Sequence, residues 1–228
     1  MIIGDFGTSY CKLLELDCPR TVPEIYSIRE ISHDLQVSMA TGHNGRRFST
    51  CYTNELTALA RGGEELIKAR DYVLLDCGSR DIKFIKYKNG KLEDMGWNAE
   101  CGASMGFTIE LLERYYNLDY SQLPVPDKAF PVTCGVLGIS SIFDAVTTGS
   151  TEKEAVAKFI KGIALNAYRF AGSPEAIYLS GGLCDNPLFV NSFPCRLIPL
   201  GRFVLLTGLV KTIRQKKNGF KKKENNQT

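Results

Sequence analysis

The chain has 228 residues, of which 44% are hydrophobic and 23% are charged, and its formal net charge is +3. These values are typical of a globular protein with one large domain or two small ones. No apolar run approaches the roughly 18 to 20 residues that cross a bilayer, and no basic segment with a cleavage site opens the chain. The sequence thus argues against a membrane-spanning helix and a signal peptide, and we expect a cytoplasmic protein with no membrane partner.

Charge is distributed unevenly along the chain. Residues 211–228 carry seven Lys or Arg and one Glu, which contributes +6, so that the rest of the chain carries −3. We expect this stretch to be a disordered, solvated tail. No aromatic-studded basic face accompanies it, and it therefore does not favour nucleic acid as a partner.

Eight cysteines are present, and no two of them form a Cys-x-x-Cys pair. A zinc ribbon or a thioredoxin-type site is therefore unsupported. In a reducing compartment most of these cysteines should be free thiols. One or two of them could still be metal ligands.

The first predicted element is a hairpin at residues 1–17. An apolar start leads into the turn Asp5-Phe6-Gly7-Thr8, and Lys12 precedes a second apolar run. A strand is expected near residues 24–31 and a helix at 53–69, with a polar loop punctuated by glycine between them. The interval between the hairpin and residue 38 is too short for a further helix.

A second hairpin at residues 72–87 repeats the first. Its apolar strand leads into Asp76-Cys77-Gly78-Ser79-Arg80-Asp81-Ile82-Lys83. A constant offset of 71 residues pairs Asp5 with Asp76, Gly7 with Gly78, Thr8 with Ser79 and Lys12 with Lys83. Such a constant offset indicates an internal duplication. Asn89-Gly90 then predicts a tight turn.

The repeated turn contains groups that bind phosphate. Glycine allows another group to approach the backbone, and successive N–H groups form a concave anion site. The hydroxyl adds a donor, and the aspartate can hold a hydrated Mg²⁺. Two such turns would clamp the β- and γ-phosphates of a nucleotide. The alternative is two ordinary hairpin turns, because Asp, Gly and Ser are common in turns.

Two cysteines precede predicted helices. Cys101 comes just before a helix with Met105, Ile109 and Leu112 on one face, and Cys134 comes before an apolar run to about residue 146. The N-terminus of a helix stabilises a thiolate, which is the form that binds iron. The residues alone favour the simpler alternative of two buried cysteines.

The last third of the chain predicts a helix, a buried strand and a glycine turn. Thr151 and Glu154 form a capping box that opens a helix to residue 170. A strand at 176–179 is followed by Ser180-Gly181-Gly182, with Asn186 close behind. Paired glycines after a buried strand let a flat adenine ring lie against the backbone, and an ordinary glycine turn is the alternative.

In this order, the motifs resemble those of the ATP-dependent activators of 2-hydroxyacyl-CoA dehydratases, iron–sulfur ATPases grouped with the benzoyl-CoA reductase ATPase subunits. That family's second loop, Asp-Ile-Gly-Gly-Gln-Asp-x-Lys, is similar to residues 76–83. Its Cys-Ala-Ala-Gly-Thr-Gly and Ser-Thr-Cys motifs are similar to residues 101–106 and 132–134. Its Thr-Gly-Gly-Val-x-x-Asn adenosine motif is similar to residues 180–186, and the resemblance covers essentially residues 1–212.

The resemblance implies an α/β fold of the two-lobed, ribonuclease H-like type found in actin, Hsp70 and sugar kinases, with a shortened first lobe. The first ATPase lobe would comprise residues 1–70 and contain the first phosphate loop. The second lobe would comprise residues 71–210 and contain the second phosphate loop, the two cysteines and the adenosine motif. Residues 211–228 would be the basic tail.

The resemblance also implies an ATPase that binds ATP or ADP with Mg²⁺ and forms a homodimer around one [4Fe–4S] cluster. Asp5 and Asp76 would hold the magnesium and act in catalysis with Arg80, and Cys101 and Cys134 of each subunit would hold the cluster. The nucleotide would contact residues of both lobes, namely Gly7, Thr8, Ser9, Lys12, Gly78, Ser79, Asp81, Lys83, Gly106, Ser180, Gly181, Gly182 and Asn186. Such a protein receives electrons from a ferredoxin or flavodoxin and delivers them at low potential to a client metalloenzyme.

Three departures from the family pattern stand out. Arg80 replaces a glutamine, Met105 replaces a threonine, and residues 135–138 replace an acidic helix start. They indicate that the client is not a standard dehydratase, and activation of another low-potential enzyme, for example a corrinoid or nickel enzyme, fits as well. Two other functions also stay open: a nucleotide-binding regulator without a cluster, and a small-molecule kinase of the same superfamily.

Overall fold

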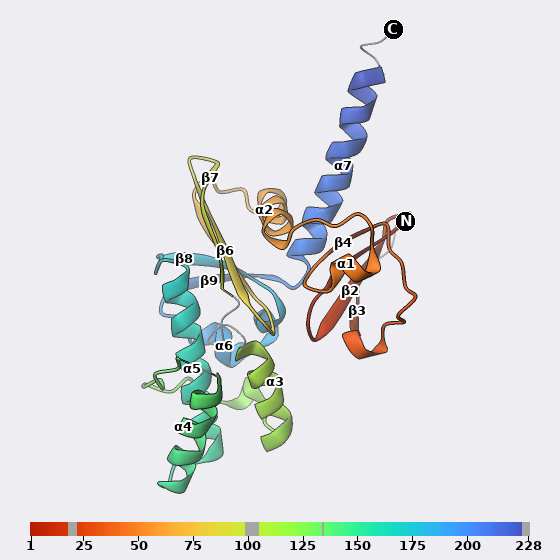
Figure 1. Cartoon of the computed structure of the whole chain (residues 1–228). Helices are drawn as coiled ribbons and strands as arrows, with labels where there is room; N and C mark the ends of the chain where they lie inside the picture. Colours follow the sequence, from red (N-terminus) through yellow and green to blue (C-terminus); the bar gives the residue numbers. More distant parts are fainter. Residues whose placement is uncertain (18–21, 99–104, 134, 225–228) are drawn as a thin grey trace. The chain divides into compact units, whose positions relative to one another are not determined.

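A computed structural model of the chain describes residues 1–17, 22–98, 105–133 and 135–224. The chain forms two compact units (Figure 1). Unit 1 comprises Met1–Ala69 together with the chain from Phe203 onward, and unit 2 comprises Arg70–Arg202. The return of the chain to unit 1 at Phe203 corrects the prediction that the second lobe continues to residue 210.

Unit 1 is built on a four-stranded sheet in the order β3-β2-β1-β4. Strand β1 (Ile2–Phe6) is antiparallel to β2 (Tyr10–Glu15) and parallel to β4 (Met39–Thr41), and β3 (Glu24–Ser27) pairs with β2. One face of the sheet carries a small core in which the rings of Phe6 and Phe48 stack with their centroids 4.3 Å apart. The hairpin predicted for residues 1–17 is therefore the centre of this unit.

The connection from β3 to β4 is short, as the sequence predicts. The strand expected to reach residue 31 ends at Ser27, whose side chain caps a single 3-10 turn, η1 (Ile28–Glu30). Helix α1 (Gly45–Phe48) follows β4. In the described part of the chain no α-helix lies between β3 and β4, which is what a shortened first lobe implies.

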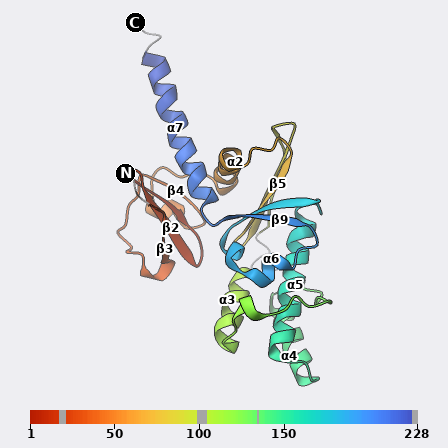
Figure 2. The ribbon, with the colours of Figure 1, turned by 180° about the vertical axis from the view of Figure 1, so that it is seen from behind.

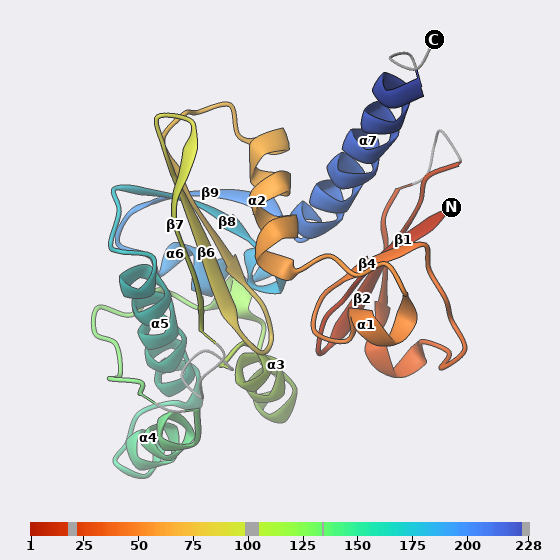
Figure 3. The same cartoon turned by 45° about the horizontal axis from the view of Figure 1, so that its top comes forward.

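Helices α2 (Glu55–Leu66) and α7 (Val204–Glu224) pack side by side in unit 1, and α7 continues past the end of α2 (Figure 3). Glycines let the two backbones come close: a Cβ at Gly62 would lie 2.1 Å from the Val204 carbonyl oxygen, and one at Gly208 would lie 1.9 Å from that of Ala58. Only glycine therefore fits at either position.

The prediction of a disordered tail from residue 211 is wrong as far as Glu224, because α7 extends to that residue. Two of its basic residues have acidic partners on α2: Lys211 lies 3.0 Å from Glu64, and Arg214 lies 3.3 Å from Glu65. Thr212, between them, is buried. The positive charge that suggested a solvated tail therefore faces a partner helix, at least along the first half of α7.

Unit 2 contains a five-stranded sheet in the order β7-β6-β5-β8-β9. Strands β6 (Ile82–Lys88) and β7 (Lys91–Asn98) continue antiparallel from β5 (Tyr72–Cys77), and β8 (Ala176–Ser180) and β9 (Arg196–Gly201) run parallel to it. All six residues of the central strand β5 are buried. The turn between β6 and β7 has positive φ at both Asn89 and Gly90, as the Asn-Gly dipeptide predicts.

The helices of unit 2 are α3 (Met105–Tyr116), α4 (Gly135–Thr147), α5 (Glu152–Phe170) and the short α6 (Pro187–Asn191), with 3-10 turns η2 (Tyr120–Gln122) and η3 (Gly182–Asp185). Helix α4 lies beside α5, which Figure 2 shows from behind. Helix α5 begins where predicted, because the Thr151 hydroxyl accepts a hydrogen bond from the Glu154 N–H at 3.2 Å. None of the helices that the structure describes is both long and apolar enough to cross a membrane.

Candidate functional site

The two predicted phosphate loops occupy equivalent places in the two units. Asp5 on β1 lies directly opposite Lys12 on β2, and Asp76 on β5 lies directly opposite Lys83 on β6. The turns close in the same way: the Gly7 N–H donates to the carbonyl of Tyr10 at 3.0 Å, and the Gly78 N–H donates to that of Asp81 at 3.1 Å. Tyr10 and Asp81 are again 71 residues apart, so the repeat extends to the hydrogen bonds of the turns.

The repeat also includes a third strand that the constant offset does not reveal. Thr41 on β4 is the parallel partner of Asp5, and Ser180 on β8 is the parallel partner of Asp76. Each hydroxyl residue is followed by a glycine with positive φ, +89° at Gly42 and +96° at Gly181. We call these three strands with their turns the hairpin module of each unit.

The two glycines have the same packing role. A Cβ at Gly42 would lie 2.5 Å from the carbonyl oxygen of Phe6, and one at Gly181 would lie 2.3 Å from that of Cys77. Phe6 and Cys77 each follow the aspartate of their module. Positive φ and this close approach both require glycine.

Loop 1, residues 5–12, is held from within unit 1. The Lys12 ammonium lies 2.6 Å from Oδ2 of Asp5, which is 3% exposed. Asn44 fastens the loop from the other side, with its side chain donating to the Gly7 carbonyl at 2.8 Å and its N–H donating to that of Phe6 at 3.0 Å. The sequence analysis did not include Asn44 in the site. Its position just after Thr41-Gly42 is the feature of the sequence that could have identified it.

Two hydroxyls at loop 1 are buried without a hydrogen-bond partner among the residues that the structure describes: Oγ of Ser9 and Oγ1 of Thr41. Thr41 is completely buried. A buried hydroxyl without a partner costs about 1 to 3 kcal/mol. A ligand that supplied an acceptor here would therefore recover that free energy.

Loop 2, residues 76–83, is bonded more densely. Oδ1 of Asp81 lies 2.5 Å from the ammonium of Lys83, and Oδ2 accepts a hydrogen bond of 2.8 Å from the indole N–H of Trp97. Lys83 is only 2% exposed, and its ammonium lies 5.6 Å from the centre of the Trp97 ring. Asp81 and Lys83, both predicted to contact the nucleotide, thus bond each other inside the loop, whereas Arg80 is exposed at its tip.

Loop 2 also rests directly on helix α3. The Phe107 N–H donates to the Ser79 carbonyl at 2.8 Å, and the Ser79 hydroxyl donates to Oε1 of Glu110 at 2.7 Å. A Cβ at Gly106 would lie 2.2 Å from the Gly78 carbonyl oxygen. Gly106, predicted to touch the cofactor, therefore lets the helix and the loop meet.

The predicted adenosine motif joins the same module. The Ser180 hydroxyl donates to Oδ1 of Asp76 at 2.7 Å. Arg202, which the sequence did not single out, lies 3.0 Å from Asp185 and donates to the Gly182 carbonyl at 3.4 Å. The Asn186 side chain caps helix α6 by accepting from the Phe189 N–H at 2.9 Å.

The predicted cluster ligands Cys101 and Cys134 lie outside the described residues. Helix α3 begins four residues after the first of them, and α4 begins directly after the second. Across the described ranges, the structure contains no group of three or more His, Cys, Asp or Glu side chains placed to hold a metal ion. Burial raises the pKa of Cys184 to about 12 and the pKa of Cys77 well above its ordinary value, so both stay neutral thiols.

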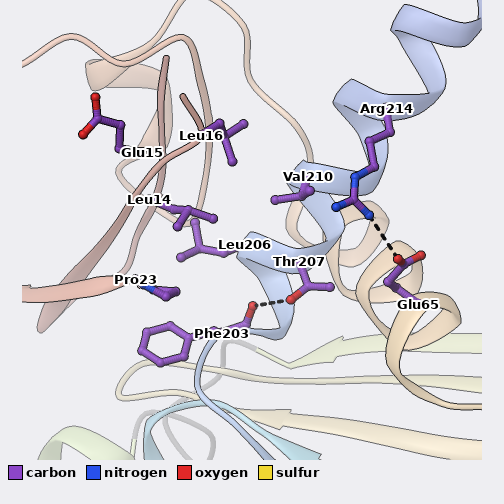
Figure 4. A pocket seen from close by; sticks show the side chains of 10 residues that line it. All are labelled: Leu14, Glu15, Leu16, Pro23, Glu65, Phe203, Leu206, Thr207, Val210 and Arg214. Atoms are coloured by element: carbon purple, nitrogen blue, oxygen red, sulfur yellow. Dashed lines mark hydrogen bonds and ion pairs between the residues drawn. The ribbon is translucent and has the colours of Figure 1, made fainter. Parts of the chain in front are cut away.

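A groove of about 360 Å³ lies in unit 1, between the end of β2 and the first turns of α7 (Figure 4). Leu14, Leu206 and Val210 are among its apolar lining residues, and Arg214 and Glu65, which also line it, form an ion pair. None of the predicted nucleotide ligands lines it. The groove is therefore separate from loop 1, although the end of β2 borders it.

No family model matches the sequence, and no curated protein matches it. Solved structures do match in fold. The activator of the 2-hydroxyisocaproyl-CoA dehydratase from Clostridium difficile, solved with bound ADPNP, aligns with a TM-score of 0.78 and 17% identity over 97% of each chain. Component A of the (R)-2-hydroxyglutaryl-CoA dehydratase from Acidaminococcus fermentans aligns with a TM-score of 0.73 and 15% identity, covering 92% of this chain and 94% of that one.

The ethanolamine utilization protein EutJ from Carboxydothermus hydrogenoformans is a more distant match, with a TM-score of 0.53 and 12% identity over 91% of this chain and 87% of that one. The chain has the α/β fold of the actin, Hsp70 and sugar kinase ATPases. The predicted fold class is therefore confirmed, as is the resemblance to dehydratase activators at the level of the fold.

Proposed function

We propose that this protein is an ATP-dependent activator that delivers electrons at low potential to a client metalloenzyme. One observation carries the proposal. The duplicated Asp–Lys hairpin lies in a fold shared, over 97% of the chain, with a dehydratase activator that was solved with bound ADPNP.

The hairpin modules supply the groups that MgATP needs. The N–H groups of Gly7 and Gly78 are used to close the turns, so we assign the phosphate contacts to the hydroxyls of Thr8, Ser9 and Ser79. The buried, unpartnered Ser9 hydroxyl fits this role. Lys12 and the exposed Arg80 add positive charge, which stabilises the transferring phosphoryl group.

Magnesium fits the same modules. Mg²⁺ is usually held by one or two carboxylates together with waters and phosphate oxygens. Asp5 and Asp76 are the carboxylates that the duplication places at equivalent strand ends. A Cβ at residue 42 would lie only 2.7 Å from Oδ1 of Asp5, so Gly42 leaves that oxygen room.

The adenine ring would lie on the backbone of Gly181 and Gly182, after β8. The hydrogen bond from Arg202 to the Gly182 carbonyl holds this turn in place. The Ser180 hydroxyl connects it to Asp76, so the base and phosphate ends of the site share one hydrogen-bonded strand pair. Asn186 supports the turn as the cap of α6.

We further propose that Cys101 and Cys134 of two subunits hold one [4Fe–4S] cluster in a homodimer. Two thiolates per chain are half of a cluster's requirement, and a twofold axis would supply the other half. Both cysteines precede helix starts, where the exposed N–H groups stabilise thiolate. When bound, the cluster would supply the one-electron chemistry.

The client is a partner of the same kind as in the dehydratase systems, with a ferredoxin or flavodoxin as the upstream electron donor in the cytoplasm. The substitution of a glutamine by Arg80 and the apolar start of α4 extend the candidates to corrinoid and nickel enzymes. ATP acts by binding two conformations of the chain with different affinity, which is the only way in which a ligand shifts such an equilibrium.

The test is anaerobic purification followed by measurement of iron, sulfide and the visible spectrum. We expect about four irons per dimer, lost in Cys101→Ala and in Cys134→Ala. As a matched control, Cys51→Ala, which changes a half-buried free cysteine of unit 1, should keep the iron. If reconstituted protein binds ATP but holds no iron, the electron-donor function is wrong and a nucleotide-dependent regulator takes its place.

A further inference from the structure

Asp76, Asp81 and Glu110 bring carboxylates to loop 2, and these carboxylates differ in what they already bond. Both side-chain oxygens of Asp81 have partners within unit 2. Asp76 accepts a hydrogen bond from Ser180, and the proposed function assigns it to magnesium. Glu110 uses one oxygen, Oε1, to accept from Ser79, and its other oxygen makes no hydrogen bond to the residues that the structure describes. Glu110 therefore has room for a further donor.

Helix α3 holds Glu110 at a fixed place beside loop 2. On its inner face Ile109, which is 1% exposed, belongs to the core of unit 2. On the side of the loop, the Phe107 N–H donates to the Ser79 carbonyl at 2.8 Å, and Gly106 lets the helix touch the loop backbone. The half-buried Glu110 side chain, one turn further along, accepts from the Ser79 hydroxyl at 2.7 Å. The helix therefore places this carboxylate at the tip of the loop.

The position of Glu110 suits a water molecule better than a phosphate. A carboxylate and a phosphate carry like charge and repel each other, whereas a carboxylate readily accepts hydrogen bonds from water. Ser79, to which the proposed function assigns a phosphate contact, has one proton to donate. When that proton goes to a phosphate oxygen, Glu110 loses its present donor and can accept from a water beside that phosphate.

Hydrolysis of ATP needs a group that orients the attacking water in line with the leaving group. The other polar side chains of loop 2 do not supply it. Asp81 is bonded inside the loop, and Arg80 and Lys83 are cations that have no acceptor for a water proton. Glu110, which the sequence motifs do not include, is the acceptor that unit 2 offers at this place.

We propose that Glu110 is a catalytic residue of ATP hydrolysis, whose carboxylate orients the attacking water and accepts its proton. The water oxygen bonds to the γ-phosphorus while the bond from that phosphorus to the β,γ-bridging oxygen breaks. ADP and inorganic phosphate are the products, and the proton passes from Glu110 to solvent. This inference deepens the proposed function and rests on its nucleotide site.

The test is the steady-state hydrolysis of MgATP by the full chain, purified anaerobically. In Glu110→Gln we expect kcat to fall by about 100-fold or more, the contribution typical of a positioned general base. KM should stay within about threefold of the wild-type value, because the change acts on the chemical step. The glutamine oxygen still accepts the Ser79 proton, so a residue that only positioned the loop would tolerate this change.

A second variant separates lost chemistry from lost structure. Glu110→Ala should lose as much kcat as Glu110→Gln, and it leaves space for a small carboxylate. Added sodium formate should therefore raise its kcat by about threefold or more, because formate can accept the water proton. Formate should not raise the kcat of Glu110→Gln, whose side chain fills the space. Failure of formate to restore any activity to Glu110→Ala would contradict the proton-accepting role.

Glu113→Gln is the matched control. It neutralises an exposed carboxylate of the same helix, three residues after Glu110, and should hydrolyse MgATP like the wild type. The Glu110 side chain is half-buried at the surface of unit 2, so its variants should fold, which circular dichroism will check.

The outcomes separate this inference from the proposed function. If titration calorimetry shows that the wild type binds no MgATP, the proposed function fails and the role of Glu110 fails with it. If MgATP binds but Glu110→Gln hydrolyses it with the wild-type kcat, the catalytic role is wrong while the nucleotide site stands. A wild type that binds MgATP without hydrolysing it also contradicts the catalytic role and leaves the nucleotide site standing.

Discussion

The hairpin module of unit 1 and that of unit 2 have the same strands, the same Asp–Lys register and the same glycine against the strand after the aspartate, but their hydroxyl groups differ. In unit 2 the Ser180 hydroxyl donates to Asp76, and the Ser79 hydroxyl donates to Glu110. In unit 1 the Thr41 hydroxyl, the counterpart of that of Ser180, is buried without a partner in the described part of the chain, and so is the hydroxyl of Ser9, whose counterpart by the offset is Arg80.

This difference indicates a division of labour between two copies of one module. Loop 2 is bonded to α3 and β7, so its hydrogen-bonding groups already have partners within unit 2. Loop 1 has buried hydroxyls that a ligand can still satisfy, so it is suited to binding. The two copies share the arrangement of the backbone, and they differ in the hydrogen bonds that the surrounding side chains make with each loop.

The largest expected effect separates the two lysines. Lys83→Met leaves the buried Asp81 without its ammonium, and breaking a buried ion pair costs about 3 to 5 kcal/mol of the free energy of unfolding. Lys12→Met should lower the free energy of unfolding by about 1 to 2 kcal/mol less than Lys83→Met does, because the Lys12 side chain is 13% exposed and that of Lys83 is 2% exposed. Urea unfolding followed by circular dichroism measures both, and equal losses would contradict the difference between the loops.

The glycines that end the third strands test how far the modules are alike. Gly42→Ala and Gly181→Ala each combine a positive φ with a clash against a strand carbonyl, and each should lose about 3 kcal/mol. Gly172→Ala is the matched control, because φ there is +83° and no atom lies within 4 Å of the added Cβ. It should lose only about 1 kcal/mol. Losses at Gly42 or Gly181 no larger than at Gly172 would show that the close contact is not required.

The hydroxyls of the third strands test the difference most specifically. Ser180→Ala removes the hydrogen bond to the buried Asp76 and should lower the free energy of unfolding by about 1 to 3 kcal/mol. Thr41→Val keeps the shape and removes a hydroxyl without a partner, so stability without nucleotide should stay the same or rise. Thermal unfolding of both variants decides the point, and an equal loss in Thr41→Val would show that its hydroxyl is already bonded.

The smallest effect concerns pH, and each unit has a buried thiol that contributes. Burial raises the pKa of Cys11 in unit 1, and of Cys184 in unit 2, from 9.0 to about 12. Above pH 9 the unfolded thiols lose protons that the folded ones keep, so stability falls as the pH rises from 9 towards 12. At pH 10 this amounts to about 1 kcal/mol per thiol. In Cys184→Ala the free energy of unfolding should fall less steeply with pH than in the wild type. Urea unfolding at pH 8 to 10 measures this, and the same dependence on pH in both proteins would contradict the prediction.

The sequence predicted those features that are encoded locally or by a constant offset. The Asp, Gly and Lys positions of both hairpins, the capping box at Thr151 and the turn at Asn89-Gly90 are of this kind. The equivalence of Thr41 and Ser180 was missed because these residues are 139 positions apart rather than 71. Insertions between the strands change the offset but leave the register of the sheet unchanged.

Features that depend on contacts between distant parts of the chain were not predictable. Trp97 bonds Asp81 across 16 residues, and Glu110 bonds Ser79 across 31. The basic C-terminal stretch was predicted to be solvated, because its composition does not show that acidic residues of α2 pair with it. Gly62 and Gly208, which let α2 and α7 approach, were the sequence signal for that packing. A glycine within a helix does not by itself indicate a close helix contact.

The most direct test of the central claim is the titration of the wild type, Asp5→Asn and Asp76→Asn with MgATP by isothermal calorimetry. If the duplicated hairpins take part in nucleotide binding, each substitution weakens the binding of MgATP by about tenfold or more relative to the wild type. Wild-type affinity in either variant would contradict the proposal that both duplicated hairpins take part in nucleotide binding.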